Sequence, residues 1–272
     1  MGSELNKRLI VSRQDCIRCF NDKLTSFRRK LSRYVRDPDH KSIHDVRTSF
    51  RRLNIAYDVL PRSCRTDDSE IYLHDARQFF NLNSQIRDWD VISLKLQAYG
   101  LSEKGKILRW IKGARKKQLK QAMKIALALN AQPRPKIDKN NSPKLNPLPM
   151  HVNKRALRFL SNQQLILADS SNKEELHSMR KDAKKLFYLL EMDNSLASAK
   201  QMSNIKMFQR LTGEIHDCDV AEIFLEEQGN AHTELHLLLT QERATRTKYY
   251  LELCEFLSDG KWQSLANLGK RK

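Results

Sequence analysis

The sequence contains few of the residues that interrupt helices. Its 272 residues include only 8 glycines and 7 prolines, and five of those prolines fall between residues 131 and 149. Stretches in which apolar and polar residues alternate, as they do in half-buried strands, are absent. Because glycine and proline are the strongest signals for turns and chain breaks, their scarcity elsewhere predicts an all-α protein with long helices.

Long apolar runs are also missing. A membrane-spanning helix needs about 20 consecutive, mainly apolar residues, and no run in the sequence approaches that length. The first residues lack the apolar core of a signal peptide. The five cysteines are an odd set without disulfide-framework spacing, which favours a reducing compartment. We therefore expect a cytoplasmic protein that does not associate with membranes.

Acidic residues are too few to balance the basic ones. The chain has 50 lysines and arginines against 32 aspartates and glutamates, for a formal net charge of +18. Such a field concentrates anions near the protein surface and speeds their encounter with it. The charge predicts a polyanionic partner but does not distinguish nucleic acid, an acidic membrane surface and polymeric phosphate.

Apolar periodicity divides the chain into eight predicted helices, four on each side of the proline-rich segment. Their expected ranges are 5–36, 39–60, 69–99 and 102–130, then 150–168, 172–193, 197–228 and 230–258. Asp37-Pro38 predicts the start of the second helix, because an acidic cap before a first-turn proline is typical of helix N-termini. Ser171 and Glu174 have capping-box spacing and predict the start of the sixth. We predict two helical bundles, over 5–130 and 150–258, joined by an extended linker over 131–149.

A cationic pattern occurs twice, 133 residues apart. Each copy has a histidine, an arginine three residues later, and two adjacent cations four and five residues beyond that arginine. The first copy is His44, Arg47, Arg51 and Arg52, and the second is His177, Arg180, Lys184 and Lys185. An Asp-x-Asp-Val pattern follows each copy, with Asp88 and Asp90 in the first half and Asp217 and Asp219 in the second. Two matches in the same order indicate an internal duplication.

Each copy of the cationic pattern separates charge from apolar residues when it is placed on a helix. With about 100° per residue, the cations of the first copy lie within about 80° of His44. The second copy repeats this arrangement and adds Lys181 to its cationic face. The opposite faces carry Val46, Phe50, Leu53, Tyr57 and Leu60 in the first copy and Met179, Ala183, Leu186 and Leu190 in the second.

A solvated face is the commonest explanation for charges along one helix. Such faces usually carry both signs, which pair at i,i+4 spacing, whereas these are almost purely cationic and occur twice. Arginine has forked donors that match phosphate oxygens, and lysine supplies a flexible point charge. The pattern therefore predicts an anion-binding surface. A structural histidine, hydrogen-bonded at a helix start, is the alternative interpretation of His44 and His177.

The aspartate pairs could instead indicate metal-assisted phosphate chemistry. Residues i and i+2 of a helix point about 200° apart, so one pair does not easily hold one ion. We expect one aspartate of each pair to orient motif arginines through charge-assisted hydrogen bonds. The sequence has no glycine-rich phosphate loop, HExxH or GxSxG motif, and Cys16-x-x-Cys19 lacks a second pair of zinc ligands. We expect no enzymatic activity, no cofactor and no bound metal.

The duplicated H-x-x-R-x-x-x-[RK]-[RK] helix, followed by [RH]-D-x-D-V in a basic helical chain, resembles the CHAD family (conserved histidine α-helical domain). The resemblance covers about residues 5 to 258. It implies two four-helix bundles related by pseudo-twofold symmetry, with a basic surface or pore that binds inorganic polyphosphate. Lysines at 184 and 185 keep the charge of the family pattern but lose the bidentate geometry of arginine. The strand motifs of the triphosphate-tunnel domain that often accompanies this family are absent, so the chain resembles a stand-alone CHAD protein.

The expected partner is therefore inorganic polyphosphate, and association with polyphosphate granules is a further expectation. Basic residues of other predicted helices should line the same surface. The complete set of predicted ligand contacts is His44, Arg47, Arg51, Arg52, Lys112, Arg115, Arg155, His177, Arg180, Lys181, Lys184, Lys185, Arg243 and Arg246.

Two alternatives to polyphosphate binding stay open. A nucleic-acid-binding protein would want exposed aromatic residues beside the cations, and Trp110, next to Arg109 and Lys112, is the best candidate. A metal-dependent polyphosphate hydrolase would use the two aspartate pairs. The chain length of the preferred ligand and the oligomeric state do not follow from the sequence.

Overall fold

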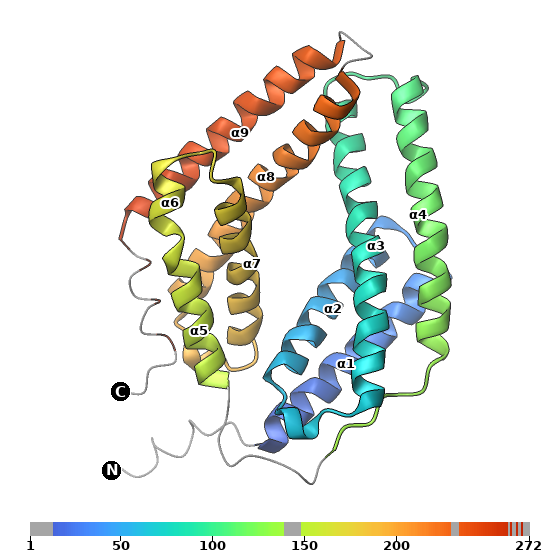
Figure 1. Ribbon diagram of the computed structural model, residues 1–272, viewed down its shortest axis with the longest axis vertical. Coiled ribbons are helices and arrows are strands. Elements are labelled where there is room, and N and C mark those ends of the chain that lie inside the picture. Colours follow the sequence, from blue (N-terminus) through green and yellow to red (C-terminus); the bar gives the residue numbers. More distant parts are fainter. Residues whose placement is uncertain are drawn as a thin grey trace. The chain divides into compact units, whose positions relative to one another are not determined.

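The computed structural model describes residues 13–138, 148–229 and 234–260, together with 262, 265 and 268. Within these residues the regular structure is helical and no strand occurs, which confirms the predicted all-α class (Figure 1). The α-helices are α1 (Arg13–Arg36), α2 (His40–Val59), α3 (Asp67–Ala98), α4 (Lys106–Ala131), α5 (Leu148–Ser161), α6 (Gln163–Ala168), α7 (Lys173–Leu190), α8 (Ala199–Gly229) and α9 (Glu234–Ser258). Two short 3₁₀ helices are η2 (Arg62–Cys64) and η3 (Asn194–Leu196).

The helices follow the predicted ranges closely, with one difference in number. The predicted helix over 150–168 is two helices, α5 and α6, separated at Asn162. The Asn162 side chain donates to the Glu175 carbonyl at 3.4 Å, and the Ser161 hydroxyl donates to the Arg158 carbonyl at 2.9 Å. Such local bonds compete with the regular helix. Parts of three predicted segments, 5–12, 139–147 and 230–233, lie outside the described residues.

The starts of α2 and α7 were predicted to within a residue or two, but the predicted capping residues were wrong. Asp39, rather than Asp37, caps α2, and its carboxylate accepts from the Ser42 amide at 2.6 Å. The predicted capping box of α7 is absent, because the carboxylate of Asp169 binds both the amide and the hydroxyl of Ser171. The residue before α7, Asn172, makes no side-chain cap.

The chain forms two compact units whose bounds divide three helices. The first contains residues 1–85 and 118–151, and the second contains 86–117 and 152–272. The bounds fall within the long helices α3 and α4 and within the first turn of α5, so each of these helices contributes one part to each unit. The predicted division into 5–130 and 150–258 cuts the chain once, whereas each compact unit combines two separate stretches of the chain. The internal duplication on which the predicted division is based stays a prediction.

The first unit has an aromatic core. Helix α1 packs against α2 (Figure 1), and Phe27 of α1 contacts Phe50 of α2 at a ring-centroid distance of 5.9 Å. Tyr34 of α1 meets Phe79 of α3 edge to face at 5.0 Å. Burial of such large rings is a main source of stability, and here it fixes the orientation of α2.

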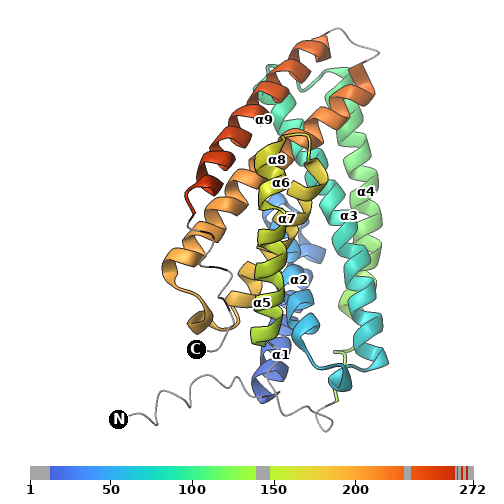
Figure 2. The same cartoon turned by 60° about the vertical axis from the view of Figure 1, so that its left-hand side comes forward.

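The second unit is built around α8, which packs against both α7 and α9 (Figure 2). Its apolar core includes Leu96 of α3, Ile111 of α4 and Phe224 of α8. A buried ion pair also joins α3 to α9: the Lys95 ammonium donates to the Glu242 carboxylate at 2.7 Å, and Tyr99 donates to the same group at 2.7 Å. Burial and the bond to Glu242 raise the pKa of Tyr99 to about 12.

The described part of the proline-rich segment runs along the first unit without regular structure. Thr66 donates to the carbonyl of Lys136 at 2.6 Å, and the amide of Asp138 donates to the carbonyl of Cys64 at 3.0 Å. Of the helices in the described ranges, none is both long and apolar enough to cross a membrane. All five cysteines are free thiols.

Candidate functional site

Helix α2 presents the first cationic motif on the side opposite its core contacts. Val46, Phe50 and Leu53 are buried against the first unit. His44 is exposed and the three arginines of the motif are half-buried. The predicted separation of an apolar face from a cationic face is therefore present from His44 to Arg52, whereas Ile55 and Val59, which follow on the side of the cations, are buried.

Phe80 of α3 organises part of this cationic face. The guanidinium of Arg51 lies 5.3 Å from the centre of the Phe80 ring, and that of Arg47 lies 6.0 Å from it. The ring itself packs on Phe50, with centroids 5.1 Å apart. An aromatic ring held by the core thus supports two arginines through cation–π contacts.

Phe80 was not predicted as part of the site. The available signal was its position next to Phe79, which is buried in the core. Adjacent residues of a helix point about 100° apart, so Phe80 cannot share that core position. Which neighbouring helix it would contact depends on tertiary packing that the sequence alone does not give.

Helix α7 repeats the arrangement in the second unit. Met179, Ala183 and Leu186 are completely buried. On the other side of the helix, Lys181 is exposed and the remaining motif cations are half-buried, as is His177. The repeated motif therefore folds in both copies as a helix with one core face and one cationic face.

His177 lies in a strongly basic environment beside a second histidine. Its ring is 5.6 Å from the ring of His216 on α8, at an interplanar angle of 32°. Burial lowers the pKa of His177, and the neighbouring charges of Lys181, Arg180 and Lys184 lower it further, while Asp219 acts in the opposite direction. These effects hold the imidazole towards its neutral form.

Asp217 of α8 borders the cationic face of α7. Its carboxylate lies 3.8 Å from the guanidinium of Arg87 on α3. Burial raises the pKa of Asp217, and this effect is opposed by the charges of Arg87, Arg180 and Lys184, among others. The charges of α7 thus act on the first aspartate of the second pair, and the expected hydrogen bond between one aspartate of each pair and a motif arginine stays a prediction.

The second aspartate of each pair has another role. Arg115 of α4 donates to Asp90 of α3 at 2.6 Å, and Arg246 of α9 donates to Asp219 of α8 at 2.6 Å. Asp90 and Arg246 are both buried. Each pair joins two consecutive long helices, and the same contact recurs in both halves of the sequence.

The predicted ligand contacts outside the two motifs all pair with carboxylates of the chain. Besides Arg115 and Arg246, Arg155 donates to the buried Asp182 at 2.6 Å. Arg243 donates to Glu226 at 2.7 Å, and the Lys112 ammonium lies 3.5 Å from Glu103, both on the surface. These pairings favour a structural role for Arg115, Arg155 and Arg246, and the five residues stay predictions as ligand contacts.

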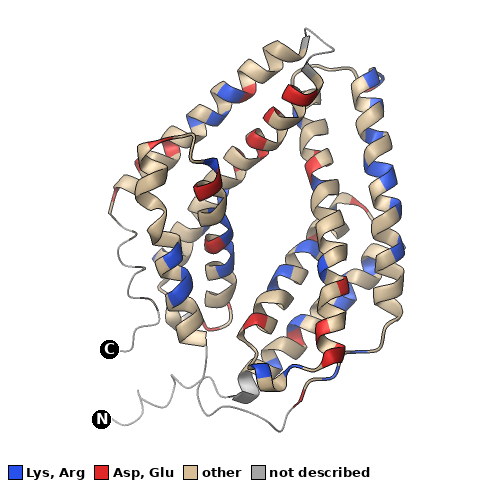
Figure 3. Ribbon diagram, viewed as in Figure 1, with Lys and Arg blue, Asp and Glu red and all other residues tan. Residues whose placement is uncertain are grey.

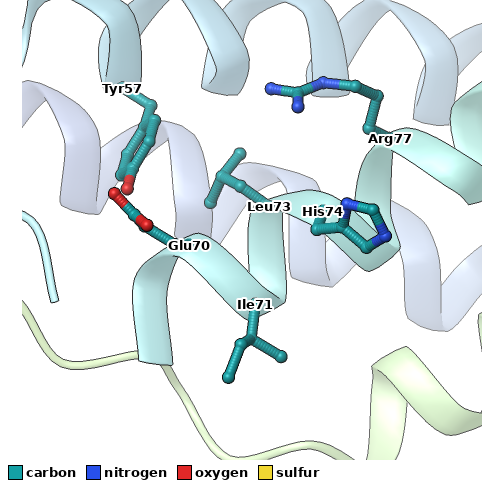
Figure 4. Close-up of a pocket in the computed structure, with 6 residues that line it drawn as sticks. All are labelled: Tyr57, Glu70, Ile71, Leu73, His74 and Arg77. Atoms are coloured by element: carbon teal, nitrogen blue, oxygen red, sulfur yellow. The ribbon is translucent and has the colours of Figure 1, made fainter. Parts of the chain in front are cut away.

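Two other features of the chain bear on the choice of site. Within the described ranges, no group of three or more His, Cys, Asp or Glu side chains is arranged to hold a metal ion. A pocket of the first unit is lined by Tyr57, Glu70, Ile71, Leu73, His74 and Arg77 (Figure 4). It combines an acidic and a basic side chain with apolar ones, which does not suit a polyanion. The cationic faces of α2 and α7, whose lysines and arginines are blue in Figure 3, remain the better candidates for a polyanion site.

Comparisons with known proteins agree with the resemblance of the motifs. The family model of the CHAD domain matches residues 18–226. Among solved structures, the chain is similar to the crystal structure of the CHAD domain from the plant Ricinus communis, with a TM-score of 0.62 and 14% sequence identity. The match covers 96% of this chain and 93% of that one. A search of curated proteins found no match.

Proposed function

The chain belongs to the CHAD domain family, and we propose that it binds inorganic polyphosphate through the cationic faces of α2 and α7. The observation that carries the proposal is the repeated separation of core and charge on these two helices. Each has a mainly apolar buried side, in which the polar members are Ser42 and Ser49 on α2 and Asp182 on α7, and the motif cations lie outside it. Two such faces on one chain with a net charge of +18 suit a long, flexible polyanion.

The chemistry of the first face suits phosphate better than bases. Phe50 and Tyr57 of α2 are buried, and two arginines lie over the ring of Phe80. The face therefore offers arginine donors, which match phosphate oxygens, while its aromatic rings are already covered. A ligand made of phosphate alone could bind to the arginine donors and would need no exposed ring.

We also propose that the chain contains two four-helix bundles related by duplication. The recurring motif supports this, as does the pairing of Asp90 with Arg115 and of Asp219 with Arg246 at the same distance. The copies are unequal, because α2 has three arginines where α7 has one arginine and lysines. Since lysine lacks the bidentate geometry of arginine, α2 should contribute more to affinity.

The proposed role is binding without catalysis, in the cytoplasm and at polyphosphate granules. Asp90 and Asp219 are engaged by arginines, which leaves them poorly suited to hold a catalytic metal ion. Incubation of polyphosphate with the protein and Mg²⁺ or Mn²⁺ should therefore release no more orthophosphate than the protein-free sample. Metal-dependent release that is lost in Asp90→Asn or Asp219→Asn would establish a hydrolase instead.

A competition experiment tests the choice of ligand. Labelled long-chain polyphosphate is displaced by unlabelled polyphosphate or by double-stranded DNA of equal total charge, at physiological ionic strength. We expect polyphosphate to compete more strongly, and its binding to weaken steeply as salt rises, by the counterion release described for nucleic acids. Equal or stronger competition by DNA would contradict the proposal.

A further inference from the structure

Trp110 of α4 is a large aromatic side chain that is half exposed yet firmly held. Its side chain is 52% exposed. The indole meets Trp89 of α3 edge to face at a centroid distance of 5.5 Å and lies 6.1 Å from Phe224 of α8. Phe224 belongs to the apolar core of the second unit. One side of the indole is thus fixed by the core while the other is open to solvent.

Cations flank Trp110 on the exposed side of α4. Lys106 precedes it by one turn, Lys117 follows it by two turns, and Arg109 and Lys116 lie along one edge of the same surface. All four are exposed, and among the described residues none of them forms an ion pair. Helix α4 contains lysines and arginines, which are blue in Figure 3, but no aspartate or glutamate. The stretch from Lys106 to Lys117 is about 17 Å long.

Gly113 lies one turn after Trp110 on this surface. A side chain built there would meet no atom within 4 Å, so no packing inside the protein requires a glycine. Glycine inside a helix is less favourable than alanine. Its presence leaves the helix backbone accessible beside the indole, where a ligand could approach closely.

We propose that this surface, formed by Lys106, Arg109, Trp110, Gly113, Lys116 and Lys117, binds single-stranded nucleic acid. A base would stack on the open face of Trp110, and the cations would contact the flanking phosphates. Base stacking on an aromatic platform within a positively charged groove or surface is how many proteins hold single strands. All of these residues belong to the second unit.

Polyphosphate and membranes fit this surface less well. Polyphosphate has no ring that could use Trp110. A membrane would require a broad apolar face, whereas the exposed neighbours of Trp110 along α4 are cations and a glycine, and the apolar Ile107 and Ala114 are half-buried. The site goes beyond the proposed polyphosphate function and shares none of the residues of the two motif helices. Either proposal can therefore fail without the other.

The test compares the full-length protein with Trp110→Ala and Trp110→Phe on two probes. One probe is an oligothymidylate and the other is an abasic deoxyribose-phosphate oligomer of the same length and charge. We expect wild type to prefer the oligothymidylate, Trp110→Ala to lose about tenfold in affinity for it, and Trp110→Phe to keep most of the affinity. The abasic oligomer should bind weakly and equally to all three proteins. Equal binding of both probes to wild type, or no loss in Trp110→Ala, would overturn the proposal.

A second variant guards against a folding defect in Trp110→Ala. Gly113→Leu keeps the indole and improves helix propensity, but it fills the space beside Trp110. We expect it to weaken oligothymidylate binding about as much as Trp110→Ala while unfolding at the same or a higher temperature. Unchanged binding by Gly113→Leu would count against a ligand that lies along the helix.

Two further readouts separate the possible ligands. Oligothymidylate should quench tryptophan fluorescence of the wild-type protein, and polyphosphate at equal charge should not. Polyphosphate affinity should be the same in wild type and in Trp110→Ala. Binding to vesicles of phosphatidylserine that depends on Trp110, without binding to oligothymidylate, would replace the nucleic-acid proposal with a membrane surface.

Discussion

Phe80 shows how a single apolar residue can shape a charged surface. Its ring connects the core residue Phe50 to the guanidinium groups of Arg47 and Arg51. Arginine loses side-chain freedom when it binds a ligand, and a preformed position reduces that cost. The ring therefore acts as a positioning residue for two of the predicted phosphate contacts.

Replacing Phe80 by leucine should weaken polyphosphate binding by about twofold to fivefold, because a cation–π contact at an exposed site contributes about 0.5–1 kcal/mol. Leucine retains most of the apolar contact with the core, so far-UV circular dichroism should not change. Replacement by tyrosine keeps an aromatic ring and should preserve the affinity. Isothermal titration with long-chain polyphosphate measures both variants. A leucine variant that binds as wild type does would remove Phe80 from the site.

His177 should make polyphosphate binding depend on pH. In the free protein, burial and the nearby cations hold its pKa below the usual value of about 6.5. A bound polyanion would favour the charged imidazolium and raise that pKa. Protonation and binding are therefore coupled, and affinity should rise as pH falls from about 8 to about 5.5. The groups around the imidazole are Arg180, Lys181 and Lys184 of α7 and His216 and Asp219 of α8.

The matched control for this prediction is His177→Gln, which cannot gain a proton in this range. Affinities of wild type and variant are measured across the same pH series at constant ionic strength. The slope should be smaller in the variant, and the two curves should converge at high pH. Identical slopes would assign the pH dependence to another group, such as His216.

At the scale of the helices, two aspartate–arginine pairs hold consecutive elements together. Asp90 fixes α3 to α4 through Arg115, and Asp219 fixes α8 to α9 through Arg246. Removing one partner from such a pair leaves a buried charge without its counterion, which costs more than the pair itself contributes. We therefore expect the carboxylates to contribute to stability rather than to ligand contact.

We expect Asp90→Asn and Asp219→Asn each to lower the free energy of unfolding by about 3 kcal/mol. The surface pair of Arg243 and Glu226 provides the control, because both side chains are more than half exposed. Glu226→Gln should change stability by less than about 1 kcal/mol. Urea denaturation followed by circular dichroism gives all three values. A cost for Asp219→Asn no greater than that for Glu226→Gln would contradict the structural role.

The same elements show what could be predicted from the sequence. The scarcity of glycine and proline, together with apolar periodicity, predicted the bounds of α2, α3, α7 and α8 within a few residues. The break between α5 and α6 was not predicted, because it depends on the contact of Asn162 with Glu175 of α7.

The site was predictable to a similar degree. The wheel positions of the motifs depend only on local geometry, and the buried residues of α2 and α7 confirm their apolar faces. The pairing of Arg115, Arg155 and Arg246 with aspartates was not predictable. Each partner lies on another helix, 25 or 27 residues away, so the contact depends on how the helices pack.

For the whole molecule, the net charge of +18 does not by itself locate a ligand. Many cations lie outside the motif helices, and several of them are neutralised by carboxylates. We therefore expect the affinity for polyphosphate to depend on the cationic faces of α2 and α7 rather than on the total charge of the protein.

Charge reversal in α2 tests this claim most directly. Arg47→Glu combined with Arg51→Glu is compared with Lys120→Glu combined with Lys124→Glu, which changes the net charge equally at two exposed positions of α4. Polyphosphate affinity and far-UV circular dichroism are measured for both proteins at physiological ionic strength. The α2 variant should lose at least about tenfold in affinity, since charge-assisted hydrogen bonds contribute about 1.5–3 kcal/mol each, and should keep its helical content. Equal affinities of the two variants would show that total charge, and not the motif, determines binding.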